Sequence, residues 1–278
     1  MRVGLTLFLT DRTIDPVTLA REGEARGFES LYFPEHTHIP ISRVTAPPTG
    51  DDELNDEYKR TLDPLVALGA AAAVTSTMLL GTGVSLVAQH DPIVMAKQLA
   101  TLDLVSGGRI TLGVGFGWNE DEMADHGVAY ATRREQAREH VLAMHQLWSQ
   151  DEASFEGRYV SFGPSWSWPK PVQQPRLRTL VGGGAGPKLF GAIAEYGDGW
   201  MPIGGGGVRS ALPELHEAWT AAGREGTPEV VPFGVLADLG KLEHYEQLGC
   251  SEVVLRVDGA SRDDTLRQLD DLSRLLPH

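Results

Sequence analysis

Residues 33–40, FPEHTHIP, place a glutamate and two histidines directly after a short apolar run. In an extended chain successive side chains alternate between two faces, so His36 and His38 point one way and Glu35 the other. Imidazoles and carboxylates can bind a metal ion, move a proton beside a coenzyme, or simply fill a polar loop. The residues at the ends of the other strands decide between these uses.

A metal site would need further histidine or carboxylate ligands from neighbouring strands. His90 follows the third apolar run and could add one ligand, but the fifth and sixth runs end in glycine. The ligand set therefore stays incomplete, and no metal site is predicted.

Glycines follow the fifth apolar run in the stretch GGGAGPK (182–188), which leads into a helix expected to begin at Pro187. Backbone N–H groups at the N-terminus of a helix form an anion site when no bulky side chain covers them. Lys188 could add a positive charge, and Arg176 and Arg178 lie just before the strand. This stretch is predicted to hold a phosphate, although turn formation alone would also explain its glycines.

The stretch GVGFG (113–117) resembles a dinucleotide fingerprint only in part, because its third glycine falls one residue early. We interpret these small residues as leaving room for a flat ligand. A planar ring bearing a phosphate would use both glycine stretches.

Strand-like and helix-like segments alternate along the whole chain, and most strand-like runs are apolar throughout, as in parallel sheets covered on both faces. The strand-like runs are 3–9, 30–33, 78–87, 109–115, 178–184, 199–203, 230–235 and 252–257. The helical patterns are 16–28, 62–74, 92–107, 133–148, 187–197, 210–223, 241–249 and 262–276. Eight such pairs predict a closed (β/α)8 barrel formed by a single domain, residues 1–278.

Two insertions interrupt this alternation. Residues 41–61 form a polar loop after strand 2 and suggest a lid. Residues 151–177, before strand 5, contain FEGRYVSF, which predicts a small hairpin around Glu156 and Gly157. An open doubly wound sheet would instead need a glycine fingerprint at the first βα turn, and LTDRTIDP has none.

The composition limits the partners and the compartment. A net charge of −14 argues against nucleic acid or an anionic membrane as the main partner. Residues 65–88 carry no charge, but polar residues and glycines divide them, so a buried helix and strand fit better than a membrane span. Cys250 is the one cysteine, which excludes an internal disulfide and suits a reducing, cytoplasmic compartment.

The stretch LGTGVSLVAQHDPIVMAKQLATLDLVSGGRITLGVGFGWNEDEM (80–123) resembles the luciferase-like monooxygenase superfamily, and in particular its branch that uses the deazaflavin coenzyme F-420. LYFPEHTHIP (31–40) and AEYGDGWMPI (194–203) are similar to the second and sixth strand regions of that family. The resemblance implies a (β/α)8 barrel, commonly dimeric, with the coenzyme ring in its mouth. GWNEDEM departs from members that act on sugar phosphates, so no substrate is carried over.

The resemblance also implies roles for individual residues. A cis peptide bond is expected at Gly83–Val84, behind the ring. The residues expected to be catalytic are His36 and Glu35. The residues expected to bind the coenzyme are Glu35, His36, Gly83, Val84, Ser85, Trp118, Asn119, Gly182, Gly183, Gly184, Ala185 and Gly186. His38 is expected to be structural or to contact substrate.

The expected activity is hydride transfer between coenzyme F-420 and a small organic substrate, in a homodimer. The alternatives are an FMN-dependent monooxygenase that uses reduced flavin and oxygen, and a barrel that only binds or stores a coenzyme. A deazaflavin does not form an oxygen adduct as a flavin does, so titration with each coenzyme separates the first two. The resemblance does not name the substrate or the direction of transfer.

Overall fold

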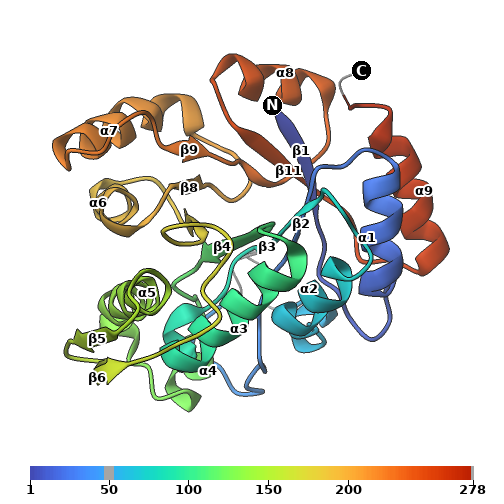
Figure 1. The fold of residues 1–278 in the computed structure, drawn as a ribbon. Coiled ribbons are helices and arrows are strands. Elements are labelled where there is room, and N and C mark those ends of the chain that lie inside the picture. The colour runs from blue at the N-terminus through green and yellow to red at the C-terminus, as the bar shows by residue number, and fades with distance from the viewer. Residues whose placement is uncertain (47–52, 277–278) are drawn as a thin grey trace.

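The computed structural model describes residues 1–46 and 53–276, and its centre is one parallel sheet surrounded by helices (Figure 1). The sheet contains β1 (Arg2–Thr6), β2 (Ser30–Phe33), β3 (Leu79–Thr82), β4 (Ile110–Val114), β7 (Arg178–Gly182), β8 (Gly199–Met201), β9 (Glu229–Val230), β10 (Phe233–Val235) and β11 (Glu252–Arg256). The helices are α1 (Pro16–Ala25), α2 (Pro64–Ala72), α3 (Pro92–Ser106), α4 (Glu120–Asp125), α5 (Arg133–Ser149), α6 (Pro187–Tyr196), α7 (Val208–Ala221), α8 (Leu239–Gln247) and α9 (Arg262–Ser273). Short 3-10 turns are η1 (Asp56–Lys59), η2 (Val87–Gln89) and η3 (Tyr130–Thr132).

The sheet closes into a barrel because β9 and β10 are two halves of one strand. The strand order runs β10-β11-β1-β2-β3-β4-β7-β8-β9, so its two ends are consecutive in the chain. The halves are separated by Val231 and by Pro232, which has no N–H for the sheet. Hydrogen bonds still cross the break, since Phe233 N donates to Pro202 O and Val254 N to Pro232 O, both at 2.9 Å. The predicted (β/α)8 barrel is confirmed.

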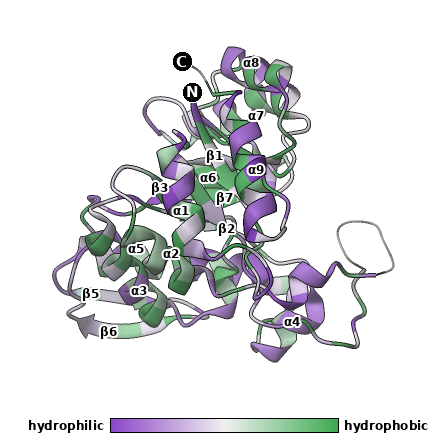
Figure 2. Cartoon of the chain, turned by 90° about the vertical axis from the view of Figure 1, so that its right-hand side faces the viewer, coloured by the Kyte–Doolittle hydropathy of each residue, from purple (hydrophilic) through white to green (hydrophobic). Residues whose placement is uncertain are grey.

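The helices form a ring around the strands, and hydrophobic residues lie between the two layers (Figures 1 and 2). A smaller apolar cluster fills the inside of the barrel and consists of Tyr32, Leu180, Met201, Val231, Phe233 and Val254. The strands are therefore covered on both faces, which explains why they are apolar throughout.

Several barrel helices begin with an aspartate followed by proline. Asp15, Asp63 and Asp91 each accept a hydrogen bond from a backbone N–H in the first turn of α1, α2 and α3. Proline fits the first helical position because its missing N–H would have no partner there. These caps place the ends of the preceding loops on the rim of the barrel.

The second insertion forms the predicted hairpin, in which β5 (Ala153–Glu156) pairs with β6 (Ser161–Ser165) outside α5. The first insertion contains η1, which returns the chain to the barrel mouth. Residues 47–52 of the predicted lid lie outside the described residues. Of the helices that the structure describes, none is long and apolar enough to cross a membrane.

A buried ionic network lies at the N-terminal end of the barrel strands. Arg178 Nη2 donates to Glu229 Oε2 at 2.6 Å and to Glu252 Oε2 at 3.0 Å, and Nη1 donates to Tyr32 Oη and Thr111 Oγ1 at 3.1 Å. Burial alone would lower the pKa of Arg178, but Tyr32 and the two carboxylates raise it above its ordinary value. Arg178 therefore lies at the end of β7 opposite to GGGAGPK and cannot assist a phosphate there.

Candidate active site

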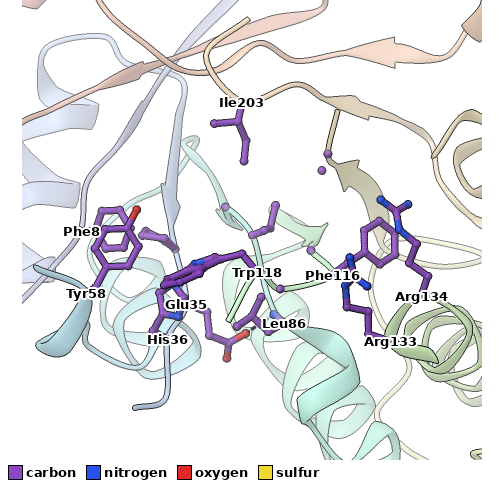
Figure 3. Close-up of a pocket in the computed structure, with 17 residues that line it drawn as sticks. Phe8, Glu35, His36, Tyr58, Leu86, Phe116, Trp118, Arg133, Arg134 and Ile203 are labelled. Carbon is purple, nitrogen blue, oxygen red and sulfur yellow. Dashed lines mark hydrogen bonds between the residues drawn. The ribbon is translucent and has the colours of Figure 1, made fainter. Parts of the chain in front are cut away.

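A cavity of about 490 Å3 opens at the C-terminal ends of β2, β3, β4 and β7 (Figure 3). Seven of the predicted site residues line it: Glu35, His36, Gly83, Val84, Trp118, Gly182 and Gly183. The other lining residues are Phe8, Pro34, Tyr58, Leu86, Gly115, Phe116, Gly117, Arg133, Arg134 and Ile203. The position agrees with the end of the barrel at which enzymes of this architecture place their chemistry.

His36 is held by the carboxylate of Glu122, which was not among the predicted site residues. Its Nδ1 lies 2.9 Å from Glu122 Oε2 and 3.1 Å from Oε1. The two side chains are 7% and 1% exposed. Since a carboxylate only accepts hydrogen bonds, Nδ1 of a neutral imidazole carries the hydrogen and Nε2 keeps the lone pair. Glu122 thereby fixes both the orientation and the tautomer of His36.

Glu122 lies in the first turn of α4. Asn119 caps this helix, and its Oδ1 accepts from Glu122 N at 3.4 Å. In an ordinary capping box the glutamate three residues after the cap turns back to the cap's own N–H, whereas Glu122 reaches His36. Asn119 caps α4 and is not among the residues that line the cavity, and its coenzyme contact stays a prediction. The Asn-x-x-Glu spacing of Asn119 and Glu122 is the sequence signal for α4, a helix that was not among the predicted elements.

Aromatic side chains from three segments surround His36. The rings of Tyr58 and Trp118 lie 5.2 and 5.9 Å from the imidazole between centroids, and Phe8 lies 4.9 Å from Tyr58. Tyr58 comes from η1, so the first insertion contributes directly to the wall of the cavity (Figure 3). The rings of Tyr58 and Trp118 therefore pack against the imidazole, and Phe8 packs against Tyr58.

Glu35 lies under the loop that follows β3. Its carboxylate accepts from Ser85 Oγ and Leu86 N at 2.6 Å, and lies 2.7 Å from His90 Nε2. Burial alone would raise the pKa of Glu35, but His90, Ser85 and Leu86 lower it. Burial alone would lower the pKa of His90, and Glu35 raises it. Glu35 thus connects the end of β2 to the loop after β3, and it is Glu122 that orients His36.

The peptide bond between Gly83 and Val84 is cis, which confirms the expected position. Two glycines make room for the Val84 side chain beside it. A Cβ at Gly115 would lie 2.3 Å from Val84 Cγ2, and one at Gly182 would lie 2.9 Å from Val84 Cγ1. Within the stretch 113–117, Gly115 and Gly117 line the cavity, and Val84 fills the space beside Gly115. That the stretch leaves room for a flat ligand stays a prediction.

Five predicted site residues lie outside the lining of the cavity: Ser85, Asn119, Gly184, Ala185 and Gly186. Ser85 binds Glu35 instead. Gly184 and Gly186 have open space where a Cβ would stand, so a ligand can approach their backbone. Gly186 caps α6, which begins at Pro187 as predicted.

Other polar groups named from the sequence are used elsewhere. His38 Nε2 lies 3.0 Å from Asp125 at the surface, so it does not converge with His36. Arg176 forms two 2.6 Å hydrogen bonds with Asp198 and is not available to the glycine loop. Within residues 1–46 and 53–276, no three metal-ligating side chains come together.

A second cavity of about 210 Å3 adjoins the first above β1, β10 and β11. The two share five lining residues: Phe8, Pro34, Tyr58, Gly83 and Ile203. The second also contains Glu57 and Arg256. Burial raises the pKa of Glu57, with Arg256 opposing the shift. The mouth of the barrel thus has a larger apolar chamber and a smaller one with a carboxyl and a guanidinium.

The larger cavity fits a flat heterocyclic coenzyme. Its volume lies within the range of ligand pockets, and its walls are mostly apolar. Gly182 and Gly183 line its edge, and the open backbone at Gly184 continues from them. A ring could occupy the apolar part while a phosphate reaches the glycine loop.

Glu35→Gln is expected to lower the free energy of unfolding by about 2–3 kcal/mol, because the amide nitrogen cannot accept from the donors that the carboxylate serves. The contribution of Glu35 is lost as pH falls through its lowered pKa, and that of His90 is lost as pH rises through its raised pKa. The difference between wild type and variant should therefore be largest between about pH 4.5 and 6.5 in urea unfolding.

Asp125→Asn is the matched control, since it removes the carboxylate charge from the exposed pair with His38. It should change stability by less than about 0.5 kcal/mol. Equal losses in the two variants would show that the Glu35 carboxylate does not stabilise the loop after β3.

Comparison with known proteins supports the architecture. An uncharacterised protein of Mycobacterium tuberculosis is 47% identical over 99% of both chains. A protein of Kineococcus radiotolerans named F-420-dependent glucose-6-phosphate dehydrogenase is 35% identical over 58% of this chain and 49% of its own. A solved structure of monooxygenase RslO1 from Streptomyces bottropensis superposes with a TM-score of 0.79 at 22% identity, over 99% and 98% of the two chains.

Residues 12–237 match the family described as luciferase-like monooxygenase. This match spans most of the barrel, from the turn after β1 to the end of β10, and includes His36 and Glu122. The chain belongs to the luciferase-like monooxygenase family.

Proposed function

We propose that the protein is an oxidoreductase that transfers a hydride between coenzyme F-420 and a small organic substrate. The pairing of His36 with Glu122 beside an apolar cavity carries this proposal, because hydride transfer to or from a carbonyl or alcohol also needs a positioned proton. The Kineococcus radiotolerans relative, named as F-420-dependent, favours this coenzyme.

The bound coenzyme would supply the hydride chemistry, and the chain would supply orientation, a dry cavity and the proton. His36 is the proposed catalytic residue, which takes or gives the proton at Nε2. Glu122 is a positioning residue that holds Nδ1. Phe8, Tyr58 and Trp118 exclude water from the reacting groups.

Glu35 is proposed to act through the loop after β3. It holds Ser85 and Leu86, whose segment carries Val84 into the cavity. Gly83, Val84, Trp118, Gly182 and Gly183 would contact the ring, and Gly184, Ala185 and Gly186 would face the phosphate.

We place the substrate in the smaller chamber, which shares walls with the coenzyme cavity. A compact molecule with an apolar body and one polar group fits this chamber, because Phe233 and Val257 lie beside Glu57 and Arg256. A panel of such alcohols and carbonyl compounds, followed by the absorbance of the coenzyme, tests the function. No turnover in either direction with any compound would contradict an enzymatic role.

Coenzyme F-420 is expected to bind more tightly than FMN, as measured by calorimetry with each coenzyme. Gly184→Asp should weaken the binding of either coenzyme, because it adds a negative charge beside the phosphate. A Cβ at Gly184 meets no atom within 4 Å, so the variant should melt at the wild-type temperature. Equal or tighter binding of FMN would contradict the choice of coenzyme.

An FMN-dependent monooxygenase is the second candidate. The description of the family and the name of the Streptomyces bottropensis structure favour it. Oxygen consumption with reduced FMN would support this candidate, whereas anaerobic turnover with F-420 would support the first.

We also propose that the protein is a homodimer in a reducing compartment. Aliphatic side chains are exposed on α2 and α3: Val66, Ile93, Val94, Leu104 and Val105. Covering them with a second copy would remove apolar surface from water, and light scattering measures the resulting mass.

Burial raises the pKa of the Cys250 thiol to about 11, so this cysteine is poorly reactive.

A further inference from the structure

Two arginines on the rim of the cavity have no role in the chemistry described above. Arg133 and Arg134 begin α5, and both line the coenzyme cavity. Figure 3 shows them on the side opposite His36 and Tyr58, next to Phe116. Gly182 and Gly183 line the same cavity.

Neither guanidinium has a carboxylate partner among the residues that the structure describes. Arg133 Nη1 donates to Tyr130 O at 2.7 Å, while its buried Nε has no partner within the described part of the chain. One turn later on α5, Arg138 forms a salt bridge with Glu195. The two rim arginines therefore differ from the next arginine of their own helix.

Aromatic rings hold both guanidinium groups in place. Arg133 lies 3.5 Å from the centroid of the Tyr130 ring, and Arg134 lies 4.3 Å from that of Phe116. Such contacts orient an arginine while leaving its N–H groups free to donate. Both arginine side chains are therefore held in position before a ligand binds.

The electrostatic surroundings agree with an anion site. Burial lowers the pKa of Arg134, and the neighbouring charge of Arg133 lowers it further. The carboxyl of Glu135 lies toward Arg158 and Tyr159 instead. Two adjacent cations with no counterion are unfavourable, and a bound anion removes this cost. A chain with net charge −14 repels anions overall, so such a local site is needed.

We propose that Arg133 and Arg134 bind the phosphate of the coenzyme, together with backbone N–H groups of the glycine loop that begins at Gly182. This assignment rests on the proposed function, and it adds the positive charge that Arg176 and Arg178 do not supply. The ring then extends from the arginines toward His36, across the length of the cavity.

Arg134→Gln is the main test, measured as the dissociation constant of ligands that differ in their anionic part. For F-420 the series is the complete coenzyme, the form with a phospholactyl group but no glutamates, and the phosphate-free 8-hydroxy-5-deazariboflavin. For flavin it is FMN and riboflavin. The variant is expected to weaken each phosphate-bearing ligand at least about tenfold and each phosphate-free ligand less than about twofold. Arg133→Gln should act in the same direction.

Arg138→Gln is the matched control, because it removes the same charge from the same helix outside the cavity. It should leave all affinities within about twofold. Thermal melting of each variant checks that it is folded. An unchanged affinity for phosphate-bearing ligands in Arg134→Gln, or an equal loss for phosphate-free ligands, would overturn the proposal. A loss confined to the glutamate-bearing form would overturn it too, and assign the arginines to the tail.

The same series separates this inference from the proposed function. If FMN binds and depends on Arg134 while F-420 does not bind, the phosphate site stands and the choice of F-420 fails. If F-420 binds tightly and Arg134→Gln has no effect, the function stands and the phosphate site fails. If wild type binds none of the five ligands, both are overturned.

Discussion

Replacing His36 with alanine is expected to lower turnover at least about tenfold and to leave coenzyme affinity within a few-fold of wild type. The imidazole is fixed by Glu122 on one side and by two aromatic rings on another, so its Nε2 has a defined position. A well-placed proton donor or acceptor contributes roughly 10²–10⁴-fold to a rate. Steady-state turnover of the compound found in the substrate panel, with calorimetry of the coenzyme, gives both quantities.

Two further variants identify the cause of the loss. His38→Ala should do much less, because His38 is bound to Asp125 at the surface. Glu122→Gln should lower turnover and change its pH profile, since an amide can present its N–H₂ to Nδ1 and favour the other tautomer. If His36→Ala abolishes coenzyme binding while the remaining bound enzyme turns over normally, His36 is a ring contact. The proton transfer then belongs to another group.

Arg178→Ala is expected to lower the free energy of unfolding by about 3–5 kcal/mol, because it removes the nearer and more buried of the two cations that Glu229 and the fully buried Glu252 contact. Arg2 remains at 3.4 and 3.5 Å from the two carboxylates. The lowered pKa of Glu229, caused by Arg178 against the opposing effect of burial, sets the pH dependence. Its stabilisation is full above about pH 4.5 and is lost as pH falls through the lowered value. The difference in the free energy of unfolding between wild type and Arg178→Ala, measured in urea, should therefore become smaller as pH falls below about 4.5.

Arg158→Ala is the matched control for this loss. Arg158 is 73% exposed and lies 4.0 Å from Glu135, so its removal should change stability by less than about 0.5 kcal/mol. If Arg178→Ala does not accumulate as a folded protein, Arg178→Lys retains the charge without the planar fork and should lose less. A loss below about 1 kcal/mol in Arg178→Ala would show that water reaches these carboxylates in solution.

The barrel was predictable because its strands and helices are encoded locally. Each strand reads as an apolar run, and the caps at Asp15, Asp63 and Asp91 mark where helices begin. The break between β9 and β10 at Pro232 was not predicted, because it lies inside one apolar run. The proline interrupts the hydrogen bonding of the strand, but the chain continues in the same direction. Helix α4 was missed because its six residues are too short for a periodic pattern.

The site was predictable to the level of strand ends and no further. The tip of β2 was correctly placed beside the loop after β3 and the end of β7, because parallel strands bring their carboxyl ends together. The hydrogen-bond partners of these side chains could not be predicted. Glu35 binds His90, which is 55 residues away in the sequence, and His36 binds Glu122, which is 86 residues away. Which of several nearby carboxylates a histidine meets depends on packing that no local pattern records.

The ionic network around Arg178 and the cavity around His36 lie at opposite ends of the same strands. Arg178 and His36 share no hydrogen-bond partner, so the effects of substituting them on the free energy of unfolding should add. Changes that alter ligand preference at the mouth can therefore be combined with changes that strengthen the base, each chosen independently. This division allows the mouth to diverge in specificity while the base retains the fold.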